Sequence, residues 1–126
     1  MIKIVALAVA ALLATPALAQ TQAQMNAAAG TRFARADAAM TVQWKATYAR
    51  MKARDDAVTS RGGGFGYAAS LLASQRAWLQ YRDTECVIEG GEFAGGSMQS
   101  MAQAQCKTRL TGERSTQLRK LRGWTR

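Results

Sequence analysis

The sequence predicts an all-α fold, a small three-helix up-down-up bundle with a long first helix. Two glycine clusters, RGGGFGY (61–67) and GGEFAGGS (90–97), divide the chain into three segments. Those segments are rich in Ala, Gln, Arg, Leu and Met, which favour helix, and they lack the alternation of apolar and polar residues that a half-buried strand shows. We therefore expect helices at roughly 21–59, 69–89 and 97–122.

The N-terminal segment resembles a secretory signal peptide. A single basic residue, Lys3, is followed by an apolar run over 4–14, by Pro16 and by the small-residue motif Ala17-Leu18-Ala19. The apolar run is too short to span a bilayer. We expect a signal peptide at 1–19, cleaved after Ala19, and one helical domain at 20–126 in the periplasm or outside the cell. No Cys follows the expected cleavage site, so we expect no lipid anchor there.

The first expected helix is much longer than the other two, so its N-terminal part can project, bend or pair with another chain. Asp37 falls within its apolar stripe, which has nearly heptad spacing. The stripe consists of Phe33, Met40, Trp44, Tyr48, Met51 and Val58.

The second expected helix contains SQRAWLQYRDTEC (74–86), with polar residues on its apolar side. On a helical wheel, Gln75 and Arg82 lie near the centre of that side. An arginine in this position requires a carboxylate or carbonyl partner, because an unpaired buried charge costs several kcal/mol.

The third expected helix has Ser97 as a candidate N-cap and carries Cys106. We expect a disulfide between Cys86 and Cys106, because disulfides persist in exported proteins. A metal site is not expected, because the chain has no His and two thiolates seldom suffice for zinc.

If the two helices are antiparallel and the cysteines face each other, Gln75 opposes Gln117 and Trp78 opposes Arg114, a possible cation–π pair. Arg82 then lies within one turn of Glu113, its first candidate partner; Asp37 is the second. Cys106 lies further into the third helix than Cys86 lies from the end of the second. This register therefore requires the loop at 90–97 to run back alongside the third helix, or that helix to begin after Ser97. The predicted buried polar core is Asp37, Gln75, Trp78, Arg82, Glu113 and Arg114.

A catalytic interpretation of Arg82, Asp83 and Glu85 is the alternative, since paired carboxylates can act as general acid and base. Asp83 points away from Glu85 on the wheel, however, and no His, nucleophile elbow or phosphate loop accompanies them. Glu85 is equally explained as an i+3 partner of Arg82. We therefore expect no enzyme activity and no cofactor.

These motifs resemble the lysozyme inhibitor LprI-like family over nearly the whole mature chain. The resemblance is carried by residues 74–79, by Tyr81-Arg82-Asp83 with Cys86, by 95–97, and by Cys106 with the Leu, Thr and Arg residues that follow it. The segment 21–26 and Ala36-Asp37 are similar to the family's first helix. Two features depart from the family: this chain has Ala27-Ala28 and no upstream Cys where relatives often carry a further cysteine pair, and it lacks the lipidated Cys of the family's named member.

The resemblance implies an exported helical domain with a lysozyme-type muramidase as its target. Four residues of the glycine-rich loops are candidate contacts, because Tyr and Arg are common interface anchors: Arg61, Phe65, Tyr67 and Phe93. In the alternative, both loops only connect helices, and the two phenylalanines cap the core. Lysozymes are often basic, so the mature chain, with a net charge of +8 once Lys3 is lost from the total of +9, needs an acidic face at such a contact.

The strongly basic C-terminal segment suggests a different function, in which the protein binds an anionic lipid or polymer of the envelope. Residues 107–126 carry seven basic residues and one acidic residue. Stabilisation of the helix C-terminus and solubility are the alternative explanation for this charge. We expect no nucleic acid partner outside the cytoplasm, and a monomer or weak dimer. The candidate contacts are Arg119, Lys120, Arg122 and Arg126.

Overall fold

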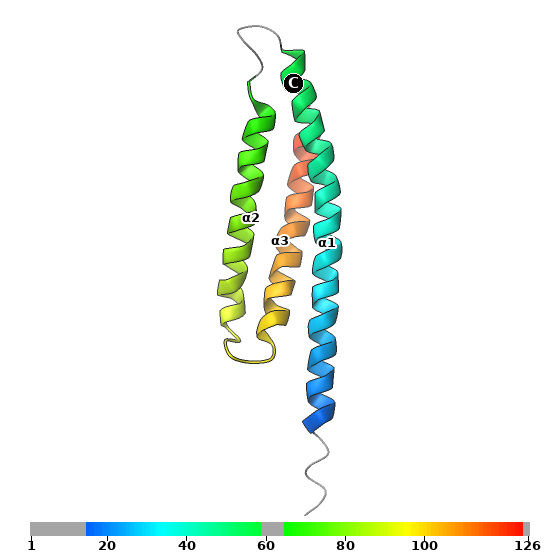
Figure 1. Ribbon diagram of the computed structural model, residues 1–126, viewed down its shortest axis with the longest axis vertical. Helices are drawn as coiled ribbons and strands as arrows, with labels where there is room; N and C mark the ends of the chain where they lie inside the picture. Colours follow the sequence, from blue (N-terminus) through cyan, green and yellow to red (C-terminus); the bar gives the residue numbers. More distant parts are fainter. Residues whose placement is uncertain (1–14, 59–64, 125–126) are drawn as a thin grey trace, which may run out of the picture.

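The computed structural model describes residues 15–58 and 65–124, with side chains from Thr21 onward. It contains three helices: α1 (Thr15–Ala57), α2 (Tyr67–Gly91) and α3 (Gln99–Arg122). They form an up-down-up bundle in which α1 and α3 run in the same direction and α2 runs in the opposite one (Figure 1). The predicted all-α, three-helix fold is confirmed.

Five of the six helix boundaries differ from the expected ones, including the start of α1 at Thr15 and the start of α2 at Tyr67. Helix α1 ends at Ala57, so Val58 lies beyond it and is 45% exposed, and its predicted place in the apolar stripe is wrong. Helix α2 continues to Gly91, and α3 begins at Gln99 with Met98 as its N-cap residue. Ser97 is therefore not the N-cap; its backbone carbonyl instead accepts a hydrogen bond from the Asn26 side chain at 3.0 Å.

The core lies between the three helices toward the end of the bundle where α1 and α3 finish. Met40, Met51, Leu71 and Leu118 are buried there and are flanked by partly buried aromatic side chains, including Trp44. Thr47 is fully buried, and its hydroxyl donates to the Leu118 carbonyl at 2.9 Å. This bond fixes α1 against α3, and it satisfies a hydroxyl that would otherwise cost free energy to bury.

The connection from α1 to α2 is secured by the carboxylate of Asp55. It accepts hydrogen bonds from the backbone N–H groups of Ala68, Tyr67 and Gly66 at 2.9–3.1 Å. These groups belong to the first turn of α2, which has no partner for them within the helix. The N–H of Ala68 foremost, and then those of Tyr67 and Gly66, hold the pKa of Asp55 below its ordinary value, against the opposing effect of desolvation.

At the opposite end, α2 and α3 approach each other closely. A Cβ added at Gly90 would lie 2.4 Å from Cγ of Gln103, so a larger residue there would displace that side chain. Gly95, in the connecting turn, has a φ of 78°, which favours glycine. The N-terminal part of α1 extends past this turn (Figure 1). None of the helices, within the residues described, has the length and apolarity needed to cross a membrane.

Candidate functional site: the buried arginine clusters and the exposed ends

The predicted disulfide between Cys86 and Cys106 is confirmed. The Cα atoms are 5.5 Å apart, and both residues are buried beside Leu110. The bond joins α2 to α3 across 20 residues of sequence. Closing a loop of this length stabilises the fold by roughly 3 kcal/mol. The register is possible because α2 runs five residues past Cys86 and α3 begins after Ser97.

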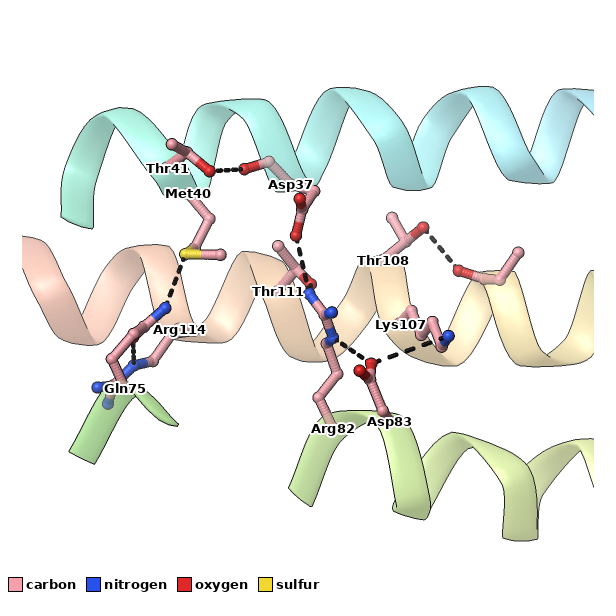
Figure 2. Close-up of polar contacts among 11 residues, drawn as sticks. Asp37, Met40, Thr41, Gln75, Arg82, Asp83, Lys107, Thr108, Thr111 and Arg114 are labelled. Atoms are coloured by element: carbon pink, nitrogen blue, oxygen red, sulfur yellow. Dashed lines mark hydrogen bonds and ion pairs between the residues drawn. The ribbon is translucent and has the colours of Figure 1, made fainter. Parts of the chain in front are cut away.

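Arg82 reaches from α2 into the space between α1 and α3 (Figure 2). Its Nη1 donates to Oδ1 of Asp37 at 2.8 Å and to the Thr111 hydroxyl at 3.4 Å, while its Nε donates to Oδ1 of Asp83 at 2.9 Å. The arginine side chain is only 8% exposed, whereas the two carboxylate side chains are about half exposed. A single guanidinium thus connects all three helices and is neutralised by two carboxylates.

The expectation that Glu113 is the partner of Arg82 is wrong. Its side chain is 57% exposed and lies 3.6 Å from Nη1 of Arg109 on the same helix. The buried face of α3 instead includes Leu110, Thr111 and Arg114, so Thr111 is the residue that meets Arg82. Asp37, the second candidate, is the partner from α1.

Sequence reasoning missed Asp83 as a partner, because the helical wheel placed it outside the buried face. Its carboxylate lies at the edge of α2, where it binds Nε of Arg82 and lies 3.8 Å from Nζ of Lys107. Two rings also flank the Arg82 guanidinium, with the centroids of Phe33 and Trp78 at 5.1 and 5.2 Å from Cζ. The adjacency of Arg82 and Asp83 in sequence was the available signal.

Arg114 forms a second buried cluster without any carboxylate. It donates to the side-chain oxygens of Gln75 at 2.9 Å, Ser74 at 3.1 Å and Gln117 at 3.1 Å. Its Cζ lies 5.8 Å from the centroid of Trp78, so the predicted cation–π contact is present. Gln75 is buried and donates in turn to Sδ of Met40 (Figure 2). Burial lowers the pKa of Arg114.

Of the three residues in the catalytic interpretation, the structure brings together only Arg82 and Asp83, whose carboxylate is engaged by Arg82 and Lys107. The explanation of Glu85 as an i+3 partner of Arg82 is wrong, because Glu85 makes no ion pair with any residue that the structure describes. In the described part of the chain, no three acidic or cysteine side chains gather as metal ligands would. A groove of about 230 Å³ opens beside the Arg82 cluster. It is lined by Asp37, Met40, Thr41, Trp44, Gln75, Leu79 and Arg82.

The candidate contact residues lie at opposite ends of the bundle. Phe65 is 77% exposed and Phe93 is 41% exposed, so the alternative in which they cap the core is wrong. Tyr67 is half-buried beneath the Arg54 guanidinium, whose Cζ lies 4.2 Å from the ring centroid. Arg61 lies outside the described residues.

The basic C-terminal residues lie at the end where α1 and α3 both finish. Arg119 and Lys120 are exposed there, and Arg122 is half-buried. Arg126 lies outside the described residues. These side chains carry positive charge at the C-terminus of α3, where the helix dipole favours it.

Comparison with known proteins assigns the family. The family model described as "Lysozyme inhibitor LprI" matches residues 14–118, and the chain belongs to this family. A protein of Rhizobium meliloti (strain 1021), named "Uncharacterized protein R02472", is 33% identical over 104 residues. That similarity covers 82% of this chain and 75% of the relative. No solved structure matches.

Proposed function

We propose that the protein is an exported binding protein that inhibits a lysozyme-type muramidase by direct contact. The observation that carries this proposal is the family match over residues 14–118. The disulfide is consistent with export, because such bonds persist outside the cytoplasm. Lysozyme-type enzymes cleave a glycosidic bond with two carboxylates in a cleft, so a protein seated over that cleft blocks the reaction without chemistry of its own.

The buried clusters support a role as framework. The cationic centre of the Arg82 cluster faces Asp37 and Asp83 rather than solvent, and Arg114 is held by neutral side chains. We infer that both clusters hold the helices in register, because fully satisfied buried polar networks rigidify a core, and that the surface carries out recognition.

Lysis of a cell-wall suspension by a chicken-type lysozyme tests the proposal. Oxidised protein comprising residues 20–126 should protect the suspension in a dose-dependent manner. A small helical protein of equal net positive charge serves as the control for nonspecific binding to the cell wall. Absence of protection at a large molar excess would contradict inhibition of this enzyme class.

A second candidate function is binding to an anionic lipid or polymer of the envelope. It is favoured by the parallel course of α1 and α3, which the Thr47–Leu118 hydrogen bond holds together. Exposed basic residues of α1 thereby lie at the same end of the bundle as those of α3. Each such charge near an anionic membrane contributes about 1 kcal/mol. The exposed basic residues at this end are Lys45, Arg50, Lys52, Arg119 and Lys120.

Cosedimentation with anionic and zwitterionic vesicles tests this candidate. The triple variant Lys52→Gln, Arg119→Gln, Lys120→Gln should lose most of its binding to anionic vesicles at low salt. Variant Arg32→Gln, Arg35→Gln removes exposed charges from the N-terminal half of α1 and should retain it. Binding that is equal for both lipids, or unchanged at high salt, would contradict an electrostatic role.

A further inference from the structure

The outward face of α2 carries exposed apolar side chains that no other helix covers. Tyr81, Val87 and Ile88 are 51%, 60% and 70% exposed. Tyr81, Thr84 and Ile88 follow i, i+3, i+7 spacing, so they lie on one face, with Val87 beside it. The buried face of α2, which includes Leu71, Gln75, Arg82, Cys86 and Gly90, points the other way. Exposed apolar residues that gather on one side of a helix and have a charged border are typical of interaction surfaces.

Acidic residues border this apolar face. The segment 83–92 contains four of the eight acidic residues of the chain and no Lys or Arg, although the chain as a whole has a net charge of +9. At 100° per residue, Asp83 lies to one side of the apolar face, and Glu85 and Glu89 lie to the other. Asp83 is paired with Arg82 and Lys107, and Glu89 is paired with Arg109. Glu85 and Glu92 form no ion pair within the described residues, so the negative charge available to a partner is theirs.

The surface continues around the end of α2. Phe93 is 41% exposed and, with Glu89, lines a groove of about 380 Å³ that reaches Cys106. The disulfide fixes the C-terminal part of α2 against α3, so the face and the groove keep their relative positions. Binding to a rigid surface avoids the entropy cost of ordering it.

We propose that this surface, the acidic face of α2, docks a cationic protein surface such as a basic lysozyme presents. It comprises Tyr81, Thr84, Glu85, Val87, Ile88, Glu92 and Phe93. The proposal deepens the proposed function and rests on it for the identity of the partner. The proposal also explains how a basic inhibitor can bind a basic enzyme. The carboxylates of this surface attract the cationic partner locally, while the basic end of the bundle, at the C-terminus of α3, faces away from it.

Affinity measurements with chicken-type lysozyme at low salt test the assignment. Ile88→Lys and Glu92→Lys should each weaken binding by about tenfold or more, because they place positive charge against a cationic partner. Matched controls are Val42→Lys, at an apolar residue of α1 that is 63% exposed, and Asp56→Lys, at an exposed carboxylate near the end of α1. Both controls should bind like the wild type, and thermal unfolding checks that all four variants are folded.

The outcomes separate the two proposals. Wild-type inhibition that persists in Ile88→Lys and Glu92→Lys would overturn the docking surface and leave the inhibitory function standing. If the wild-type protein neither binds nor inhibits lysozyme, the proposed inhibitory function is overturned. The proposal that a lysozyme docks on this surface then fails as well. A dimer, measured by light scattering, that Ile88→Lys dissociates without any lysozyme binding would show that a second copy covers the face, and would also overturn the proposal.

Discussion

The two buried arginines of this bundle are stabilised in different ways. Arg82 and Arg114 are 7% and 6% exposed, and both stand beside Trp78. Arg82 is bound by two carboxylates that are themselves half exposed, whereas Arg114 is bound by two amide oxygens and one hydroxyl. Equal burial therefore accompanies two different electrostatic environments.

The difference shows what a carboxylate contributes to burying a cation. Burial lowers the pKa of Arg114, because neutral dipoles compensate the lost hydration only in part. The carboxylates of Asp37 and Asp83 reach the Arg82 guanidinium while remaining partly hydrated, so the pair gains Coulomb attraction without full desolvation of both partners. Arg82 also joins α2 to α1, a connection that the disulfide does not make.

Of the substitutions that test this difference, Arg82→Met should reduce stability the most. It removes two charge-assisted hydrogen bonds and leaves Thr111 without its donor, and we expect a loss of about 3 kcal/mol in the free energy of unfolding. Urea denaturation of the oxidised protein measures this loss. Arg82→Lys, which retains the charge but not the planar fork, should recover part of the stability. A loss below about 0.5 kcal/mol, which is typical of a surface substitution, would show that the cluster contributes nothing.

Replacement of Arg114 by Met should cost less, about 1 kcal/mol. The substitution leaves the buried oxygen of Gln75 unpaired, but it also removes a cation whose burial is unfavourable. The double variant Arg114→Met, Gln75→Leu should return close to wild-type stability, because it removes both polar partners together. A cost for Arg114→Met that equals or exceeds that of Arg82→Met, under the same denaturation conditions, would invalidate the distinction between the two sites.

Replacement of Asp55 should have the smallest effect on stability. Its carboxylate is a third kind of contact, because it is held by backbone N–H donors and not by side chains. Its pKa is lowered in the folded state, so its contribution to stability is fully present above about pH 4, the ordinary Asp range, and is lost as pH falls through the folded pKa. Thermal unfolding of the wild type and Asp55→Asn between pH 7 and pH 2 measures this. The gap in Tm should stay constant above about pH 4 and close below it. A difference in Tm that does not change down to pH 2 would contradict the claim that the ionised Asp55 carboxylate stabilises the start of α2.

The fold was predictable from the sequence because its signals are local. Glycine clusters at 61–67 and 90–97 interrupt otherwise helix-favouring segments, and the two cysteines had only each other as partners. The helical wheel also identified Gln75 and Arg82 as buried, since both lie among apolar residues of α2. Burial of Arg114 and its contact with Trp78 followed from the register that the disulfide sets.

The contacts that were predicted wrongly or missed depend on rotation about the helix axis and on side-chain reach. A small rotation of α3 places Thr111, and not Glu113, on the buried face beside the correctly predicted Arg114. Asp83 reaches Arg82 from the edge of its own helix, which a wheel based on Cα positions does not capture.

We infer that the buried clusters maintain the fold while the surface of the bundle acts on the partner. The most direct test compares lysozyme inhibition by the wild type and by Arg82→Met, both oxidised and both well below their unfolding temperatures. Equal protection of the cell-wall suspension at equal concentration, within about twofold, is the predicted result. Loss of protection by a folded Arg82→Met protein with unchanged helical content would contradict the claim and place the Arg82 cluster itself in the functional site.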